Sequence, residues 1–276
     1  MVNHTHKPFT DYDIQALLYD ERRVEMFMRA IQETVRPGDV VVDAGSGTGL
    51  LGLLAAKQGA AKVYCLELNS YFIPVIEENA KRNGLADRIV AVAADATTCA
   101  LPEQVDVIIC EVISAGFFYE PQLQILANLR KYLKPGGRMV PFAVENKIEL
   151  IDAQEELYGL TLTYDSRFSP LPKDAPLTGA VTYLDTDFYK DCDDVIAAEV
   201  ALRATSTGEA NAARITYRIS FTPGLGSSEP TDFLLNPQII FLRSPVKLIE
   251  GEDYKLSIRY RASTAPISSE IIVDRR

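Results

Sequence analysis

Short apolar runs alternate with longer helix-like runs along the first half of the chain. The apolar runs, typical of buried strands, cover residues 40–42, 62–66, 88–93 and 105–110. Helices are predicted over residues 50–58, 71–83 and 121–132, and one or two more over residues 13–34. A stop at residues 134–137 separates the last helix from a short strand that ends at Val140. This alternation predicts a parallel, doubly wound α/β sheet.

The spacing of the apolar residues changes after Pro141. Residues 214–221 and 253–261 alternate polar and apolar side chains with a period of two, which is typical of half-buried strands. Further strands are predicted over residues 142–151, 199–205, 238–242 and 268–273. The pattern predicts an antiparallel sandwich or barrel. We therefore expect three parts: N-terminal helices over residues 1–35, the α/β sheet over residues 36–140 and a β-barrel-like domain over residues 141–276.

A glycine-rich turn follows the first predicted strand and opens a helix. It reads Asp43-Ala44-Gly45-Ser46-Gly47-Thr48-Gly49. Glycines let a backbone turn sharply and approach a ligand, and a helix N-terminus offers it unpaired N–H groups. The dinucleotide fingerprint would need its third glycine at position 50, where this chain has Leu50. The spacing therefore argues against a nicotinamide-dependent oxidoreductase.

Two acidic residues indicate which ligand this turn suits. Asp43 closes the first strand, where a carboxylate is unfavourable beside a pyrophosphate but acceptable beside an ammonium group. Glu67 ends the second strand, about 20 residues further on, where a carboxylate can accept both hydroxyls of a ribose. An adenosine cofactor with an ammonium, a sulfonium and no phosphates is S-adenosylmethionine, whose product form is S-adenosylhomocysteine. The alternative is a tight strand–helix turn that binds no ligand.

Composition limits the partners and the compartment. The chain has 28 basic and 38 acidic residues, a net charge of −10 at pH 7, and an acidic surface repels a phosphate backbone. The charge suits a cationic substrate or cofactor, although solubility alone also accounts for it. No apolar run reaches the ~18 residues of a membrane span, and the N-terminus lacks the apolar stretch of a signal peptide. The four cysteines form no C-x-x-C pair, which predicts reduced thiols and no metal site. We expect a cytoplasmic protein with neither a nucleic-acid nor a membrane partner.

With these motifs the chain resembles the class I, Rossmann-like methyltransferases, and more specifically the protein arginine methyltransferase family. The matching segments are residues 18–23, 43–49, 67–69 and 111–120, and faintly 238–242 and 249–252. Pro141 falls where that family passes from its Rossmann-like half to a β-barrel. The resemblance implies that residues 36–140 bind S-adenosylmethionine, that the N-terminal helices lie over the cofactor, and that the barrel helps to bind the substrate.

The resemblance also implies individual cofactor contacts. Arg23 would grip the cofactor carboxylate, and Asp95 would lie near the adenine amino group. For Asp95 the alternative is a loop residue that caps the following turn. The remaining predicted cofactor contacts are Asp43, Gly45, Ser46, Gly47, Gly49, Glu67, Leu68 and Ala96.

Two glutamates nine residues apart, Glu111 and Glu120, match that family's double-glutamate loop. A guanidinium is planar, permanently charged and forked, so two carboxylates can clamp it from two sides. Such a clamp holds one nitrogen in line with the sulfonium methyl and biases positive charge toward the other nitrogens. We therefore predict both as catalytic and substrate-binding residues, with either carboxylate able to take the departing proton. Glu120, before Pro121, could instead be a first-turn acid favoured by the helix dipole, and Glu111 a solvated residue at a strand end.

The chain departs from the family around the predicted acceptor site. It has no Trp, its only histidines are His4 and His6, and residues 234–236 read Leu-Leu-Asn where the family has Thr-His-Trp. Asn236 can hydrogen-bond a polar substrate but cannot accept a proton near pH 7. Tyr19 is the other predicted substrate contact. The family's dimerisation arm is shortened to a segment within residues 169–194, so the sequence allows a homodimer but does not establish one.

These departures argue against a protein substrate more strongly than they argue against methyl transfer itself. We expect an S-adenosylmethionine-dependent N-methyltransferase that acts on a guanidino or amino group of a cationic small molecule or an arginine-containing substrate. Free arginine or a small metabolite fits better than a protein. Two alternatives stay open: a small-molecule O- or N-methyltransferase of secondary metabolism that merely shares the glutamate loop, and a catalytically weak binding partner that keeps the fold.

Overall fold

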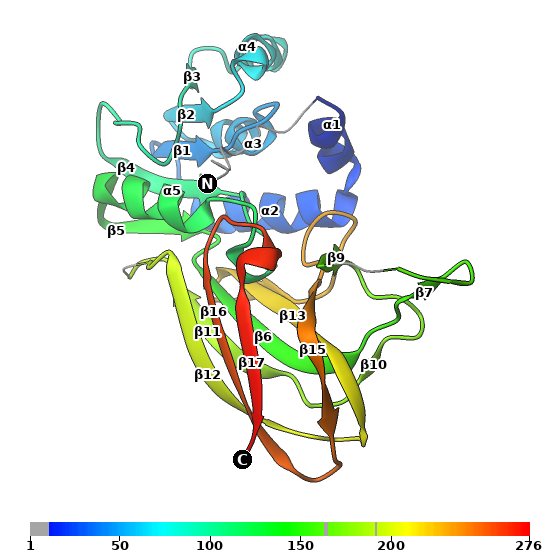
Figure 1. Ribbon diagram of the computed structural model, residues 1–276. Coiled ribbons are helices and arrows are strands. Elements are labelled where there is room, and N and C mark those ends of the chain that lie inside the picture. The colour runs from blue at the N-terminus through cyan, green and yellow to red at the C-terminus, as the bar shows by residue number, and fades with distance from the viewer. Residues whose placement is uncertain (1–10, 163–164, 191) are drawn as a thin grey trace.

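The first half of the molecule is built on one parallel sheet. The computed structural model describes residues 11–162, 165–190 and 192–276 (Figure 1). The five strands are β1 (Val40–Ala44), β2 (Lys62–Glu67), β3 (Ile89–Ala93), β4 (Val105–Cys110) and β5 (Leu133–Val140). Their order is β3-β2-β1-β4-β5, and all four pairings are parallel. The predicted doubly wound sheet is confirmed. Its order reverses beside β1, which is where sheets of this kind bind ligands.

Within the described residues, five α-helices accompany this sheet. They are α1 (Asp11–Tyr19), α2 (Glu21–Thr34), α3 (Leu50–Gln58), α4 (Ile73–Arg82) and α5 (Gln122–Leu129). The segment over residues 13–34 forms two helices because Asp20 interrupts it and caps α2, accepting from the Arg23 N–H at 3.1 Å. Short 3₁₀ turns lie at Ser70–Phe72, Ala115–Phe117, Arg130–Tyr132 and Pro266–Ser268.

The second half consists of antiparallel strands. They are β6 (Ala143–Asp152), β7 (Glu156–Leu157), β8 (Leu160–Thr161), β9 (Ser166–Phe168), β10 (Ala175–Pro176), β11 (Val181–Asp187), β12 (Val195–Arg203), β13 (Gly208–Thr222), β14 (Leu225–Ser227), β15 (Gln238–Leu248), β16 (Asp253–Arg261) and β17 (Glu270–Arg275). One sheet has the order β10-β6-β13-β15-β9, with β11 on β6 and β14 on β13, and another has the order β12-β16-β17. The predicted antiparallel β-barrel-like half is confirmed.

The structure differs from the sequence prediction at the end of the parallel sheet. Residues 134–137, predicted as a stop before a short strand, lie inside β5. The pairing of β4 with β5 shifts register between Val105 and Val107, from Leu133 to Arg138, and so leaves the Pro-Gly-Gly segment between them without partners in β4. The chain then passes from β5, which ends at Val140, to β6, which begins at Ala143.

Helix α2 lies between the parallel sheet and the barrel (Figure 1). It contacts α3 and β5 in the first half and β13 in the second. The Phe27 ring on α2 meets the Phe221 ring on β13 edge to face, with centroids 5.0 Å apart. One cluster of buried apolar side chains runs through both halves. The two halves therefore share a core, so elements of one can position loops of the other.

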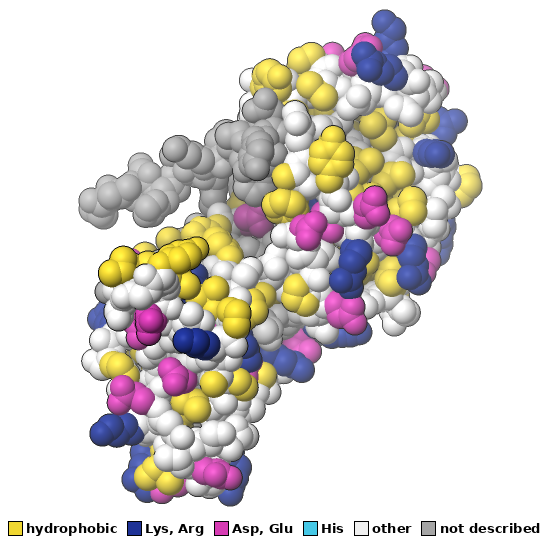
Figure 2. Space-filling model, turned by 90° about the vertical axis from the view of Figure 1, so that its right-hand side faces the viewer, with side chains coloured by type: hydrophobic (Ala, Val, Ile, Leu, Met, Phe, Trp, Pro, Cys, Tyr) yellow, Lys and Arg dark blue, Asp and Glu magenta, His cyan; other side chains and the backbone are white. Residues whose placement is uncertain are grey.

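The surface carries both signs of charge. On the face drawn in Figure 2, basic side chains are interspersed with acidic ones over both lobes. Among the described residues, no helix has the length and apolar character that a membrane crossing requires. The same residues contain no group of three or more His, Cys, Asp and Glu side chains that could hold a metal ion.

Candidate active site

The glycine-rich turn lies at the carboxyl end of β1 and leads into α3. The N–H groups of Gly45 and Ser46 donate to the Leu66 carbonyl at 2.9 and 3.0 Å, and the Ser46 hydroxyl donates to the Asp43 carbonyl at 2.8 Å. Left-handed backbone is shared by Gly45, Gly47 and Gly49, with φ of 75°, 53° and 84°. A Cβ on Gly45 would come within 2.6 Å of the Val112 side chain. The turn therefore packs directly against the loop that carries the two glutamates.

The two acids predicted to hold the cofactor end β1 and β2. Asp43 is buried and its Oδ2 accepts from the Gly52 N–H at 2.9 Å; burial raises the pKa of this carboxyl to about 7. Both oxygens of the buried Glu67 accept backbone N–H groups, from Gly47 and Asn69, at 2.8 Å each. Each carboxylate oxygen has two lone pairs, so Glu67 can still accept two hydroxyls. A ribose and an ammonium group are compatible with this arrangement.

The predicted adenine-side residues follow β2 and β3. Asp95 is exposed, and its Oδ1 accepts from the N–H and the hydroxyl of Thr97 at 2.9 and 2.6 Å. This is the turn-capping geometry that the sequence left open as the alternative. Ala96 is buried and Leu68 is 48% exposed. The contacts of these three residues with a cofactor stay predictions.

Arg23 and Glu111 form a bidentate ion pair between α2 and the loop after β4. Arg23 Nε donates to Glu111 Oε1 at 3.0 Å, and Arg23 Nη2 donates to Oε2. A third bond runs from Arg23 Nη1 to the carbonyl of Leu17 at 3.2 Å. The Arg23 and Glu111 side chains are 7% and 13% exposed, so the reading of Glu111 as a solvated residue is wrong. The arginine assigned to the cofactor carboxylate thus contacts one of the two glutamates.

Glu120 lies one residue ahead of Pro121, the N-cap of α5. Removal from water and the negative charge of Glu111 raise the pKa of Glu120 to about 8, against the opposing effect of Arg23. Because Glu120 precedes this N-cap, it lies outside the first turn of α5. Within the described ranges, no hydrogen bond or ion pair reaches the Glu120 carboxylate. One carboxylate of the pair bonds an arginine, and the other has no ion-pair partner within the described ranges.

Tyr19 and Asn236, the other predicted substrate contacts, are placed differently. Tyr19 ends α1 and is 79% exposed. Asn236 lies between β14 and β15, and its amide donates to the carbonyl of Asp232 at 3.1 Å. No hydrogen bond among the described residues joins either of them to Glu111 or Glu120. Their contact with a substrate stays a prediction.

Asp20 is a candidate that the motifs did not reveal. This buried carboxylate caps α2, and its Oδ2 accepts from the Phe233 N–H at 2.9 Å and from the Thr231 hydroxyl. It thereby joins the helix that carries Arg23 to the barrel loop that stands where the family has Thr-His-Trp. An N-cap acid in front of Glu21 was the available signal. Its partners lie 211 and 213 residues away, and no local pattern points to them.

Tyr217 on β13 bonds the same barrel loop. Its buried hydroxyl accepts from the Leu235 N–H at 2.8 Å. Burial, and to a lesser extent the charges of Glu120 and Glu111, raise the pKa of Tyr217 well above its ordinary value. The barrel therefore contributes an aromatic hydroxyl to the surroundings of the two carboxylates.

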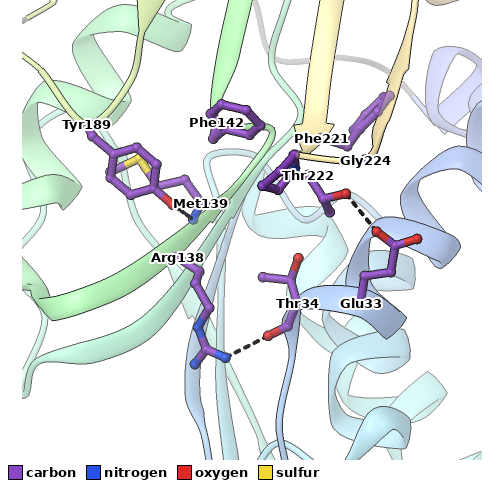
Figure 3. A pocket seen from close by; sticks show the side chains of 10 residues that line it. Glu33, Thr34, Arg138, Met139, Phe142, Tyr189, Phe221, Thr222 and Gly224 are labelled. Atoms are coloured by element: carbon purple, nitrogen blue, oxygen red, sulfur yellow. Dashed lines mark hydrogen bonds between the residues drawn. The ribbon is translucent and has the colours of Figure 1, made fainter.

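A separate pocket of about 370 Å³ lies where α2, β5 and the barrel meet (Figure 3). Its polar side chains are bonded to one another and to backbone: Arg138 donates to the Thr34 carbonyl, Thr222 donates to Glu33, and the Tyr189 hydroxyl accepts from a backbone N–H. None of the predicted site residues lines it. This pocket is thus distinct from the site around Glu111 and Glu120.

Comparison with known proteins places the chain among methyltransferases. The family model for ribosomal protein L11 methyltransferase matches residues 23–157. An uncharacterized protein of Methanocaldococcus jannaschii is 28% identical over 250 residues, with 89% of this chain and 90% of that protein covered. An arginine N(omega)-methyltransferase of Streptomyces achromogenes subsp. streptozoticus is 26% identical over 281 residues, with 92% of this chain and 77% of that protein covered.

A solved structure shows the same fold. The Trypanosoma brucei PRMT1 enzyme–prozyme heterotetrameric complex, determined with AdoHcy, matches with a TM-score of 0.75 at 21% identity. The match covers 94% of this chain and 96% of that chain. Both the parallel sheet and the barrel-like half are therefore shared.

Proposed function

We propose that this chain, an S-adenosylmethionine-dependent methyltransferase that resembles the arginine methyltransferases, methylates a guanidino nitrogen of free arginine or of another small molecule. The resemblance, the enzyme class and the cofactor predicted from the sequence are confirmed by the relatives and the family match. The glutamate pair supports the guanidino acceptor most strongly, because Glu111 has an arginine partner and Glu120 beside it has none in the described ranges. A planar, permanently charged fork fits such a pair better than a phenol or a carboxylic acid does.

Two observations favour a small acceptor over a protein. The Streptomyces relative is named for arginine, and the match covers 92% of this chain. The barrel loop that carries Thr-His-Trp in protein arginine methyltransferases reads Leu234-Leu235-Asn236 here, and both leucines are buried. That loop therefore offers neither an imidazole nor an indole to a bound polypeptide.

Different residues of the chain would bind the cofactor, position the acceptor and accept the proton. When bound, S-adenosylmethionine supplies an electrophilic methyl group on a sulfonium, and Asp43, Glu67 and the glycine turn are the residues that would hold it. Glu120, together with the lone pairs of Glu111 that Arg23 does not use, holds the guanidinium so that one nitrogen faces the methyl group. That nitrogen would take the methyl group, with S-adenosylhomocysteine as the leaving group, and would then lose a proton. Glu120 takes this proton: its pKa of about 8 leaves it mostly protonated near pH 7 in the free protein, and the bound cation ionises it before the transfer.

The acceptor is tested with three classes of compound. Methyl transfer from labelled cofactor is measured to free arginine, to an arginine-rich peptide and to a simple phenol, with binding of S-adenosylhomocysteine followed by thermal shift as a control for the fold. We expect labelled methylarginine as the main product. Transfer only to the peptide would exclude the small acceptor. Transfer only to the phenol or to a carboxylate would exclude guanidino chemistry and favour the secondary-metabolism alternative.

The same proposal assigns cofactor binding and acceptor binding to different parts of the chain. Residues 36–140 bind the cofactor, residues 141–276 contribute to the acceptor site, and the helices within residues 1–35 lie beside both. A homodimer is the proposed assembly, since the Trypanosoma relative is itself a complex of several chains. Light scattering that reports a monomer at all concentrations would exclude it.

A further inference from the structure

The backbone between Glu111 and Glu120 is strained. Gly116, Phe117 and Tyr119 are left-handed, with φ of 64°, 56° and 63°. A Cβ on Gly116 would come within 2.7 Å of the Phe118 ring, so this position requires glycine. Non-glycine residues adopt such a backbone only where their surroundings hold it. The distance between the two glutamates therefore depends on whatever holds this turn.

Side chains of the barrel bond both backbone groups of Gly116. Asn146 on β6 accepts from the Gly116 N–H through Oδ1 at 2.8 Å, and Tyr260 on β16 donates its hydroxyl to the Gly116 carbonyl at 2.8 Å. The Tyr260 hydroxyl also lies 2.8 Å from that of Tyr183, and its ring stacks on Phe118 with centroids 4.4 Å apart. Asn146, Tyr183 and Tyr260 are buried. The midpoint of the glutamate loop is thus anchored in the barrel.

The turn after β16 bonds the second part of the loop. The Ser263 N–H donates to the Phe117 carbonyl at 2.8 Å, and the Tyr119 N–H donates to the Thr264 carbonyl at 3.3 Å. The Ser263 hydroxyl donates to the backbone carbonyl of Glu120 at 3.0 Å. The barrel therefore bonds this backbone from Gly116 to Glu120.

Asn146 has a feature that packing does not explain. Its side chain has no exposed surface, and its Nδ2 has no hydrogen-bond partner among the described residues. A buried amide without a partner is unfavourable, and a leucine would fill a similar volume without that group. The bond from the Gly116 N–H to Oδ1 is what an asparagine offers at this position and a leucine does not.

We propose that Asn146 and Tyr260 are positioning residues, which set the separation of Glu111 and Glu120 by bonding the N–H and the carbonyl of Gly116. This inference rests on the function proposed above. It makes two side chains of the β-barrel necessary for the chemistry although neither bonds the glutamate side chains.

Asn146→Leu tests the first bond. The substitution removes the acceptor of the Gly116 N–H and nearly preserves side-chain volume. We expect kcat to fall about 10- to 100-fold, because small displacements of a clamp have effects of this size. KM for the cofactor should change less than about twofold, since the bond does not touch the cofactor turn. Hydrogen exchange of the amides in residues 111–120 should accelerate at least about tenfold, as expected for a loop that has lost an anchor.

Asn211→Leu is the matched control. Asn211 on β13 accepts from the Ala153 N–H at 2.7 Å and donates to the Ala153 carbonyl at 2.9 Å, so its loss also removes asparagine bonds within the barrel. We expect this variant to keep the parent kcat and the parent exchange in residues 111–120, even where its Tm is lower. A general weakening of the barrel would instead lower kcat in both variants.

Tyr260→Phe tests the second bond and keeps the stacked ring. Both bonds act on Gly116, so the two substitutions should lower kcat together by less than the product of their separate factors. A purely structural role predicts lower Tm values with an unchanged kcat in the folded protein. Where Asn146→Leu does not fold, Tyr260→Phe decides by the same two measurements.

Two results separate this inference from the proposed function. A folded Asn146→Leu that binds S-adenosylhomocysteine, retains the parent kcat and shows the parent exchange overturns the positioning role. A parent protein that methylates no guanidino compound overturns the proposed function instead. In that case the exchange of residues 111–120 alone decides whether Asn146 and Tyr260 hold the loop.

Discussion

The glycine turn and the glutamate loop leave neighbouring strands of one sheet, yet they are held in opposite ways. The turn after β1 bonds the Leu66 carbonyl and the Glu67 carboxylate at the end of the adjacent strand β2. The loop after β4 is bonded at Gly116 by Asn146 and Tyr260, which lie 30 and 144 residues further along the chain. The glycine turn, the proposed cofactor side of the site, is therefore held within the α/β half, whereas the glutamate loop, the proposed catalytic side, is also held by the barrel.

This difference predicts that some substitutions impair cofactor binding alone and that others impair catalysis alone. Substitutions in the glycine turn should weaken binding of S-adenosylhomocysteine, and substitutions in the glutamate loop should lower kcat with that binding intact. A variant of one region that affected only the function of the other would contradict the comparison.

Glu120→Gln is expected to have the largest effect. No hydrogen bond of the described residues reaches this carboxyl group, so the substitution removes, with little rearrangement, a group that ionises beside a bound cation and accepts a proton. Loss of one fixed electrostatic contact to a transition state costs about 10²–10³ in kcat, and we expect a loss of this order. Steady-state methylation assays measure it, and the thermal shift with S-adenosylhomocysteine should match that of the parent.

Glu103→Gln controls for the change in net charge. Glu103 accepts from Lys62 at 2.8 Å on the surface, at the opposite end of β2 from the site, and its side chain is 40% exposed. A surface pair contributes little, so this variant should keep the parent kcat. Equal losses in the two variants would mean that net charge, and not the position of Glu120, governs the rate.

Gly45→Ala is expected to act on the cofactor side. The residue has a φ of 75°, and a Cβ there would lie 2.6 Å from the Val112 side chain. The strain of about 1–3 kcal/mol falls on the turn that faces the ligand, so affinity for S-adenosylhomocysteine should fall roughly tenfold by calorimetric titration. Gly38→Ala is the matched control, since Gly38 has a φ of 91° with nothing within 4 Å of its Cβ position. It should lower Tm and leave the affinity unchanged.

The sequence predicted what depends on neighbours along the chain. The strands at residues 62–66 and 105–110 and the cofactor turn between Asp43 and Gly49 follow from local patterns of apolar residues and glycine, and the structure places them there. The segment at 134–137 was predicted as a stop because Pro and Gly are poor strand formers; it lies within the bounds of β5, but the pairing with β4 passes from Leu133 to Arg138 and skips it.

The missed residues depend on contacts between the halves. Asp20, Asn146 and Tyr260 each bond a backbone group of a distant loop, and nothing near them in the sequence distinguishes them from ordinary polar residues. The pairing of Arg23 with Glu111 belongs to the same class, since 88 residues separate them. Local pattern therefore predicted the types of residue in the site, but not the bonds that place them.

The pH dependence of stability should distinguish the two regions further. The pKa of Glu120 in the folded protein, about 8, lies above the ordinary value of ~4.3, so folding favours the protonated form. Its contribution to stability is therefore fully present below about pH 4 and is lost as the pH rises through about 8. Scanning calorimetry should show the Tm of the parent falling relative to that of Glu120→Gln between about pH 5 and 8.

The pKa of Asp43, on the cofactor side, is shifted in the same direction as that of Glu120, but Asp43 is present in both proteins of that comparison. Its pKa is raised to about 7 by burial, and its titration therefore cancels in the difference between parent and variant. Parallel Tm curves for the two proteins would show that Glu120 titrates as an ordinary carboxylic acid. The electrostatic difference between the two loops would then be absent.

Substitution of Asp95 should have the smallest effect. It tests whether Asp95 contacts the cofactor in addition to Asp43, Glu67 and the glycine turn. Its Oδ1 accepts both polar hydrogens of Thr97, so Asp95→Ala removes a turn cap together with any contact to the cofactor, whereas Thr97→Val removes only one bond of the cap. One hydrogen bond is worth about 0.5–1.5 kcal/mol, or roughly two- to tenfold in affinity. If Asp95 contacts the adenine, Asp95→Ala weakens S-adenosylhomocysteine by this factor and Thr97→Val does not. If both variants lower Tm and neither changes the affinity, Asp95 is a turn cap alone, and the cofactor side depends on Asp43, Glu67 and the glycine turn.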